Sequence, residues 1–154
     1  MSTFAPSVIG AEHPSRTVLL ERGRLRMFAS AIGETDPIYT DVDAARAAGH
    51  PDLPVPPTFF FGLAFTGDLA DDAGWMLKLG FDLGRVLHGE QSFSYHSLAH
   101  AGETLVLSPR ITDAYDKRDG ALQFVERTTS VATTDGRAVV DMRELVVHRR
   151  PEGA

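Results

Sequence analysis

The chain has 154 residues, a formal charge of −6 and no cysteine. This length predicts a single domain with a sizeable core. The lack of cysteine excludes disulfides, thiolate nucleophiles and cysteine-based zinc sites, and the excess of acidic residues argues against a nucleic-acid partner. A signal-peptide pattern and a long apolar run are both absent, so we expect a cytoplasmic protein without membrane contact. Histidine, carboxylate and hydroxyl groups remain for any chemistry.

The first third of the chain predicts short helices after an irregular start. Residues 1–14 read as an irregular N-terminal lead-in, and 16–20 as a short strand. From residue 21 the apolar side chains recur at helical spacing, and a glycine follows where the helix should end: Leu25, Phe28, Ala29, Ile32 and Gly33. Asp41 is placed to cap a second short helix over 42–48, which Gly49 ends.

A proline-rich connector over 50–57 leads into the segment 58–65, which is apolar on all sides rather than on one face. In a protein that is not embedded in a membrane, such a helix belongs in the middle of the fold. Residues 68–80 predict only another helical turn or two.

The second half changes to a period of two. Four long strands are predicted over 85–96, 104–115, 121–133 and 137–149, with turn residues between them. Because the links are short, we expect consecutive strands to pair antiparallel. Residues 15–150 therefore form the single domain, and 151–154 a frayed tail.

Helices followed by antiparallel strands indicate an α+β protein. An antiparallel sheet wrapped around the central apolar helix, the hot-dog fold, accounts for this order economically. The cone-shaped α+β fold of nuclear-transport-factor-like proteins has the same order of elements. The short apolar helix between prolines favours the hot-dog fold.

The segment Gly33-Glu34-Thr35-Asp36-Pro37-Ile38-Tyr39 resembles the active segment of MaoC-like hot-dog hydratases and dehydratases, Gly-Asp-x-Asn-Pro-x-His. The glycine and the proline are in register. The three chemical positions differ, because Glu34 replaces the aspartate, Asp36 the asparagine and Tyr39 the histidine.

Three further motifs resemble one branch, the MaoC dehydratase N-terminal-type domain: Pro56-Pro57-Thr58-Phe59, Leu87-His88-Gly89-Glu90-Gln91 and Ala101-Gly102-Glu103-Thr104-Leu105. This branch includes the non-catalytic subunit of mycobacterial acyl-carrier-protein dehydratases. The resemblance covers about residues 15–150. It implies an acyl-CoA or acyl-carrier-protein substrate, no metal, and no cofactor beyond the CoA or phosphopantetheine that the substrate carries.

In the family, a carboxylate and a histidine hold the reacting water, and a backbone N–H at the start of the central helix binds the thioester carbonyl. The resemblance therefore implies Glu34 and Tyr39 as catalytic candidates, and Asp36, Pro57, Thr58 and Phe59 as substrate-binding candidates. Tyrosine, with an ordinary pKa of about 10, is a poor base at neutral pH. Tyr39 would act as a hydrogen-bond donor, or simply as a half-buried aromatic side chain. Glu34 would in the same way be only a surface turn residue, and Asp36, before Pro37, only a structural cap of the turn.

The histidines offer weaker candidates. His50 lies in the connector beside this segment and is a candidate replacement for the missing family histidine. His88 and Glu90 share strand parity, so they are predicted as same-face neighbours, either an acid/base pair or a solvated strand face.

The other histidines predict no chemistry. His96 and His100 have helical spacing but straddle the end of a predicted strand, which does not suit a metal site. His13 and His148, near the termini, are expected to face solvent.

Three functions follow from the resemblance. The first is an acyl-thioester hydratase or dehydratase, which reversibly hydrates 2-enoyl-CoA or an enoyl-carrier-protein to the 3-hydroxyacyl thioester, with Glu34 as the carboxylate. The second is a non-catalytic hot-dog subunit that holds the acyl chain for a catalytic MaoC-like partner. The third is a hot-dog acyl-CoA thioesterase. A homodimer or a heterodimer is expected.

Overall fold

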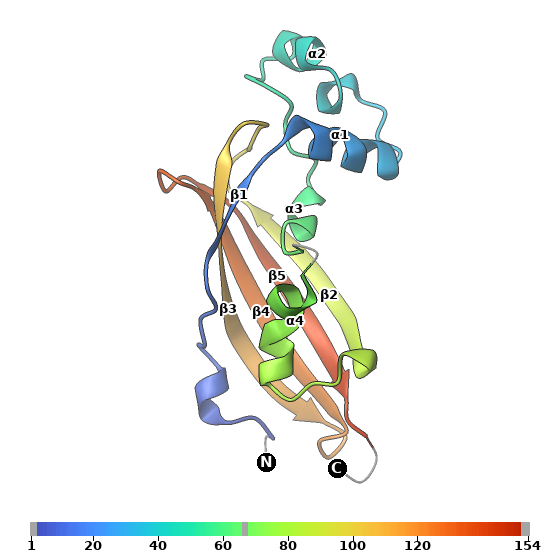
Figure 1. Cartoon of the computed structure of the whole chain (residues 1–154), viewed down its shortest axis with the longest axis vertical. Coiled ribbons are helices and arrows are strands. Elements are labelled where there is room, and N and C mark those ends of the chain that lie inside the picture. Colours follow the sequence, from blue (N-terminus) through green and yellow to red (C-terminus); the bar gives the residue numbers. More distant parts are fainter. Residues whose placement is uncertain (1–2, 66–67, 152–154) are drawn as a thin grey trace.

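The computed structural model describes residues 3–65 and 68–151. Its centre is one antiparallel sheet in the order β1-β3-β4-β5-β2 (Figure 1). The strands are β1 (Arg16–Leu19), β2 (Val86–Tyr95), β3 (Thr104–Lys117), β4 (Leu122–Thr133) and β5 (Ala138–Arg149). The short strand and the four long strands are confirmed, with ends within a few residues of those predicted.

The prediction that consecutive strands pair is wrong for the first long strand. β2 pairs with β5, whereas the far edge of β3 is taken by β1. The link over 96–103 does not form a hairpin, because it is bound to other segments at the end of the sheet. Ala101 donates its N–H to the Leu53 carbonyl, and Gly102 donates to the Leu20 carbonyl. These bonds hold the link where it crosses the end of the sheet from the edge strand β2 to β3, which lies next to the opposite edge strand β1.

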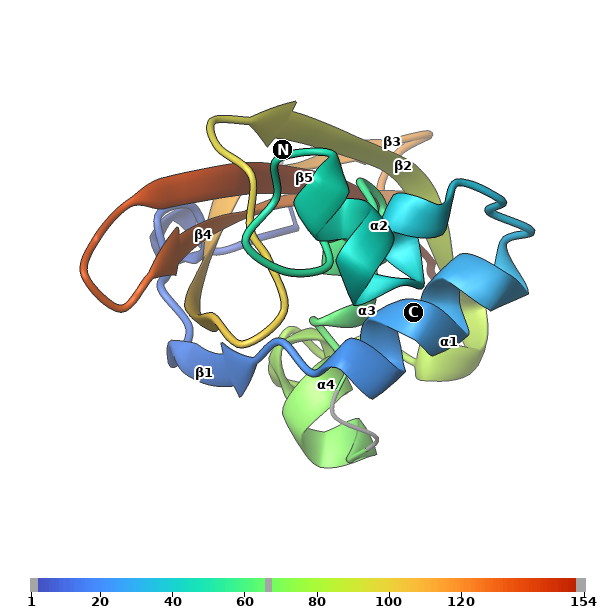
Figure 2. The ribbon, with the colours of Figure 1, turned by 90° about the horizontal axis from the view of Figure 1, so that it is seen from above.

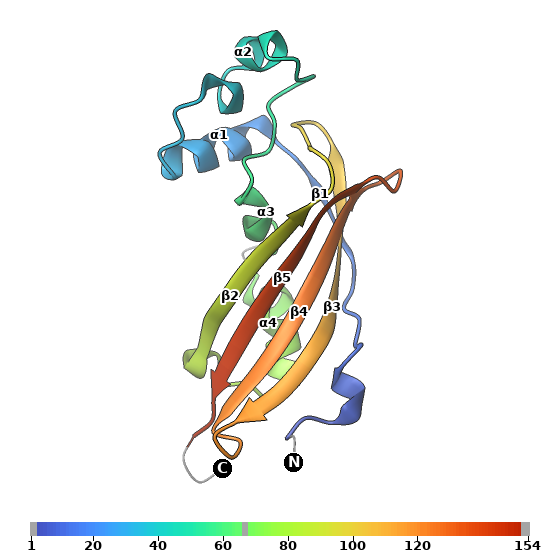
Figure 3. The same cartoon turned by 180° about the vertical axis from the view of Figure 1, so that it is seen from behind.

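The helices divide into two groups. α1 (Arg22–Ala31) and α2 (Val42–Ala47) gather at one end of the sheet, and the first and last described parts of the chain lie at the opposite end (Figure 1). α3 (Phe59–Gly62) and α4 (Leu69–Lys78) lie along one face, and the sheet curves around them (Figure 2). We call this the inner face. No helix in the described part of the chain covers the other, outer face (Figure 3).

The helix ends form as the sequence predicts. After α1, Gly33 adopts a positive φ of 72°, and its N–H bonds to the Ser30 carbonyl. The Asp41 side chain accepts the Asp43 N–H at the start of α2. The lead-in is less irregular than predicted, because it holds the 3-10 helix η1 (Pro6–Val8) and a bridge from Glu12 to β3. Pro151 is exposed, and the rest of the predicted tail lies outside the described residues.

The central apolar helix is shorter and less enclosed than predicted. Phe59, Phe60 and Leu63 are almost fully buried, but Phe65 is 52% exposed. The sheet covers only one side of this segment, which explains the difference. α4, in contrast, is a ten-residue helix rather than a turn or two. None of the helices within residues 3–65 and 68–151 has the length and apolar character needed to cross a membrane.

Two apolar clusters fill the inner face. One surrounds α3 and includes Leu105, Leu107, Val131 and Val140. The other surrounds α4 and includes Trp75, Phe81, Val125 and Val146. β4 also turns polar side chains to this face, since Arg127 and Thr129 lie between Val125 and Val131 with the same strand parity. The inner face is thus apolar beneath α3 and mixed beneath α4.

Candidate functional site

The segment that resembles the family's active motif is a turn held together by its own carboxylates. Glu34 Oε1 accepts the N–H groups of Thr35 at 2.8 Å and Asp36 at 2.9 Å. Asp36 Oδ1 accepts the Ile38 N–H at 3.1 Å and caps the 3-10 helix η2 (Pro37–Tyr39). Both acidic side chains therefore have a structural task, of the kind that short acidic residues perform in turns.

Tyr39 lies beside these carboxylates and is half-buried. Burial raises the pKa of its hydroxyl above the ordinary value of 10, and the negative charges of Glu34 and Asp36 raise it further. The hydroxyl stays protonated at neutral pH, so it can donate a hydrogen bond but cannot act as a base. The segment 33–41 thus places the two predicted catalytic residues, Glu34 and Tyr39, beside each other. It contains no histidine.

The start of α3 contributes the predicted substrate-binding residues. Phe59 N–H is already bonded to the Pro56 carbonyl at 3.0 Å. The N–H of Thr58 makes no hydrogen bond within the described residues, and Pro57 and Thr58 are exposed. Of the two predicted carbonyl donors, only Thr58 is unengaged. Phe59 is buried edge-on against Phe28 of α1, with ring centroids 5.4 Å apart.

An apolar cavity of about 260 Å³ opens beside this start of α3. Tyr95, at the end of β2, donates its hydroxyl to the Pro57 carbonyl at 2.7 Å and so joins the strand to the helix start. Burial raises the pKa of Tyr95. No role for Tyr95 was predicted from the sequence. The cavity is lined by Val55, Pro57, Phe60, Tyr95, His96, Ser97, Leu98 and Ala99.

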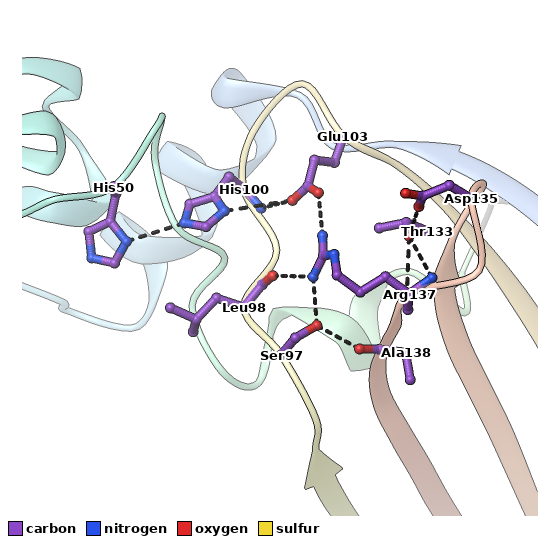
Figure 4. Close-up of polar contacts among 9 residues, drawn as sticks. All are labelled: His50, Ser97, Leu98, His100, Glu103, Thr133, Asp135, Arg137 and Ala138. Atoms are coloured by element: carbon purple, nitrogen blue, oxygen red, sulfur yellow. Dashed lines mark hydrogen bonds and ion pairs between the residues drawn. The ribbon is translucent and has the colours of Figure 1, made fainter.

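His50 is bound into a separate polar network (Figure 4). Its Nδ1 lies 3.2 Å from Nε2 of His100, whose backbone N–H bonds to Glu103 at 2.6 Å. Glu103 in turn pairs with Arg137 of the β4–β5 hairpin, and Arg137 donates to the Leu98 carbonyl at 2.8 Å. The pKa of His100 is lowered, chiefly by burial. No hydrogen bond or ion pair in the described part of the chain links His50 to Glu34 or Tyr39.

A β-bulge separates His88 from Glu90. His88 faces Val146 of β5, whereas Glu90 faces Leu145, the next residue on the same strand. The extra residue, Gly89, therefore turns the two side chains to opposite faces of the sheet. His88 stacks on Phe61 at 5.2 Å on the inner face, and Glu90 pairs with Arg143 on the outer face. The predicted same-face arrangement does not form.

The expectation that His148 faces solvent is wrong. It is 3% exposed, stacks on Phe81 at 4.4 Å and accepts the Asp82 N–H on Nε2 at 3.1 Å. Its Nδ1 lies 2.9 Å from Gln123 Oε1, so Nδ1 carries the proton of a neutral ring. Burial lowers the pKa of His148. The hydrogen-bond partners lie far from His148 in the sequence and could not be predicted. The inward orientation of the ring could have been predicted, because it follows from the alternation of side chains along the strand.

His13 is half-buried rather than solvent-facing. His96 pairs with Asp141 at 2.8 Å on the outer side of the sheet, an arrangement that sequence reasoning missed. Among the described residues no group of three or more acidic or histidine side chains is arranged to hold a metal ion.

These features define the class of the protein. A curved antiparallel sheet around short apolar helices, with the Gly-x-x-x-Pro turn in the helical end, is the architecture of MaoC-like hot-dog dehydratases. A family model described as "FAS1-like, dehydratase domain region" matches residues 7–142. The chain belongs to this family.

Two relatives extend the comparison. A UPF0336 protein from Streptomyces coelicolor is 42% identical over 109 residues, which cover 68% of this chain and 69% of that protein. A UPF0336 protein from Saccharopolyspora erythraea is 34% identical and covers 96% of this chain and 95% of its own length.

Solved structures agree with the fold. The ChsH1–ChsH2 complex from Mycobacterium tuberculosis aligns with a TM-score of 0.74 at 25% identity, covering 94% of this chain and 92% of that one. The HadBC 3R-hydroxyacyl-ACP dehydratase complex from the same organism gives 0.74 at 21%, covering 91% and 96%. The hydratase PhaJ1 from Pseudomonas aeruginosa gives 0.66 at 16%, covering 93% and 83%.

Proposed function

We propose that this chain is a non-catalytic hot-dog subunit that holds the acyl chain of a 2-enoyl or 3-hydroxyacyl thioester while a MaoC-like partner supplies the catalytic carboxylate and histidine. The observation that carries this proposal is the composition of the motif turn: Glu34, whose Oε1 accepts two backbone N–H groups, is accompanied by Tyr39 where the family has its histidine.

The proposed reaction needs a base for the water and an acid for the α-carbon of the thioester. A group that works as both needs a pKa near the operating pH. Tyr39, with its raised pKa, does not meet this requirement. His50 is directed toward His100 and Arg137 instead of this segment. The chain alone therefore offers a carboxylate but no histidine to share the water with it.

The free edge of the sheet supports a paired subunit. Among the described strands, β2 is hydrogen-bonded only to β5, on one side, and a free strand edge is a template for pairing with another chain. Large apolar side chains stand exposed along or just beyond this strand, with Leu87 64%, Tyr95 49% and Leu98 61% exposed. Tyr95 and Leu98 also line the apolar cavity at the start of α3. A partner on this edge would enclose that cavity.

The comparisons lend further support, since two of the structurally similar proteins are complexes of two named components, ChsH1–ChsH2 and HadBC. We infer that the partner of this chain is a hot-dog protein that carries the intact Gly-Asp-x-Asn-Pro-x-His segment. The shared ligand would be an acyl-CoA or acyl-carrier-protein, with no other cofactor.

The test is to express the chain alone and together with such a partner encoded by the same organism. We expect a stable complex on co-purification, hydration of crotonyl-CoA by the complex, and no turnover by this chain alone. Turnover by the purified chain at a rate equal to that of the complex would overturn the proposal.

One observation favours a second candidate, in which the chain is itself a hydratase acting as a homodimer. A carboxylate, Glu34, is retained in the motif and lies next to a hydroxyl that can donate. Under this candidate, Glu34→Gln would abolish the turnover of the isolated chain. No arrangement in the described part of the chain favours the thioesterase hypothesis.

A further inference from the structure

A second cavity lies on the inner face beneath α4, away from the start of α3. Its volume is about 350 Å³, within the usual range for small-molecule sites. The walls come from α4, from β3 and β4, and from residues 13–16 of the N-terminal segment. It contains none of the residues of the candidate site in 33–41 or at the start of α3. None of the residues assigned to the proposed hydration reaction lines it.

One of the groups that line the cavity is the guanidinium of Arg127, a charged group on the inner face of the sheet. Arg127 points inward from β4, where its Nε donates to Glu144 at 2.5 Å. The two side chains are only 12% and 17% exposed. The Nη groups of Arg127 make no hydrogen bond to any described residue. The Nη groups carry four N–H donors and are not among the fully buried unpartnered atoms. Because Arg127 lines the cavity, these donors are available to an acceptor bound there.

The indole of Trp75 forms an apolar wall next to this charge. The Arg127 guanidinium carbon lies 4.6 Å from the ring centroid, and Trp75 is 6% exposed. The indole Nε1 and the Nδ1 of His13, both on cavity-lining residues, are buried without a partner among the described residues. A buried polar atom without a partner costs about 1–3 kcal/mol, so these two atoms mark a wall where a hydrogen-bonding ligand would add stability.

The charges around the cavity favour a monoanion. Burial lowers the pKa of His13, and the positive charges of Arg127 and Lys78 lower it further, so the potential at this ring is positive. Lys78 makes no ion pair within the described residues. Two carboxylates, Asp71 and Asp72, also line the cavity, and Asp72 lies 3.7 Å from Arg16. These acids limit the positive potential and disfavour a phosphate dianion.

We propose that this cavity binds a small organic carboxylate with a flat apolar body. The carboxylate would accept from the Nη groups of Arg127, whose planar fork matches its two oxygens. The body would lie against Trp75 and Leu107, in the space left by the small α4 residues Ala70 and Gly74. The charge of Arg127 thus separates a carboxylate from a neutral molecule of equal size.

The chain provides its own reporter, since Trp75 is its single tryptophan. Benzoate is the probe, with benzyl alcohol as the neutral control of similar size and inorganic phosphate as the anion control. The fluorescence of Trp75, excited at its red edge, and titration calorimetry are followed together. We expect a saturable signal with benzoate, and none with the alcohol or with phosphate. Equal responses to benzoate and benzyl alcohol, or no saturable response to benzoate, would overturn the proposal.

Gly74 allows the cavity to be filled without a clash, because a Cβ built there meets no atom within 4 Å. Gly74→Leu should remove benzoate binding while the chain still folds. The matched control is Gly23→Leu, in α1, where a Cβ also meets open space. Lys78→Met, on the exposed side, should weaken binding by about threefold. Unchanged benzoate affinity in a folded Gly74→Leu variant would contradict the proposed location.

Discussion

Burial controls the protonation of several side chains, and His148 shows the consequence most directly. Its ring is enclosed by Phe81, Gln123 and the backbone of Asp82, and it accepts one hydrogen bond and donates another. Only the neutral ring satisfies both partners, since a protonated ring has no acceptor. Lowered pKa values at His13 and His100 have the same principal cause, which is burial.

This lowered pKa predicts a pH-dependent stability. In the unfolded chain His148 has an ordinary pKa near 6.5, whereas in the folded chain the pKa is lower. As the pH falls below 6.5, the unfolded chain takes up the proton first, so the stabilising contribution is lost toward acid pH. Chemical denaturation between pH 7.5 and 5 should show a smaller loss of stability in His148→Gln than in the wild type. An equal loss in both proteins would contradict the assignment.

The carboxylates of the motif turn give a second prediction at this scale. Asp36→Ala removes the acceptor of the Ile38 N–H and should lower the free energy of unfolding by about 1 kcal/mol. Asp36→Asn keeps an acceptor and restores the residue typical of the family, so it should be close to neutral. Thermal and urea unfolding of the two variants distinguishes them. An equally large loss of stability in Asp36→Asn would mean that the negative charge of Asp36, rather than its hydrogen bond to the Ile38 N–H, stabilises the turn.

Among the elements, β2 has two functions that its sequence only partly reveals. One edge of β2 pairs with β5. The bulge at Gly89 shifts the register, so the side chains on either side of it, His88 and Glu90, point to opposite faces of the sheet. The other edge is free and carries exposed apolar side chains. β2 is therefore the element through which we expect both the internal register and the partner to be set.

The bulge predicts intolerance of any larger residue at 89. A Cβ on Gly89 would lie 3.2 Å from the Leu145 carbonyl oxygen and 3.2 Å from Val147 Cγ2. Because one of these atoms belongs to the backbone, Gly89→Ala should cost about 1–3 kcal/mol of stability. Ser92→Ala, at an exposed position of the same strand, is the control and should have little effect. Urea unfolding that finds Gly89→Ala neutral would show that the strand shifts easily.

The free edge predicts the location of the partner. Leu87→Lys and Leu98→Lys place charges among the exposed apolar side chains beside β2 and should weaken association with the partner without unfolding the chain. Leu19→Lys, at a 52% exposed leucine on the opposite edge strand, should leave association unchanged. Size-exclusion chromatography with light scattering measures both. Equal weakening by all three substitutions would argue against a specific interface at β2.

At the scale of the whole molecule, the sequence predicts what depends on local patterns. The period of α1, the glycine that ends it, the Asp41 cap and the four long strands are all local, and all were predicted. The position of β2 next to β5 depends on bonds between distant segments, such as Ala101 with Leu53, which have no local signal. The burial of His148 was missed although strand parity, which it shares with the buried Val146, indicates it.

The candidate site divides in the same way. The motif turn at 33–39 could be found from its glycine and proline, and the structure adds how Glu34 is used. The apolar cavity beside Tyr95 and the charged cavity beneath α4 each join segments far apart in the chain. No spacing in the sequence indicates, for example, that Trp75, Arg127 and His13 lie close together. For this reason neither cavity could have been predicted from the sequence.

The central claim is that another chain carries out the chemistry, and one measurement tests it directly. The kcat for crotonyl-CoA hydration is compared between the wild-type complex, the complex with Glu34→Gln in this chain, and the complex with the partner's motif aspartate changed to asparagine. We predict a kcat close to wild type for the first variant and nearly complete loss for the second. Loss of turnover from Glu34→Gln in an intact complex would show that this chain is itself the catalyst.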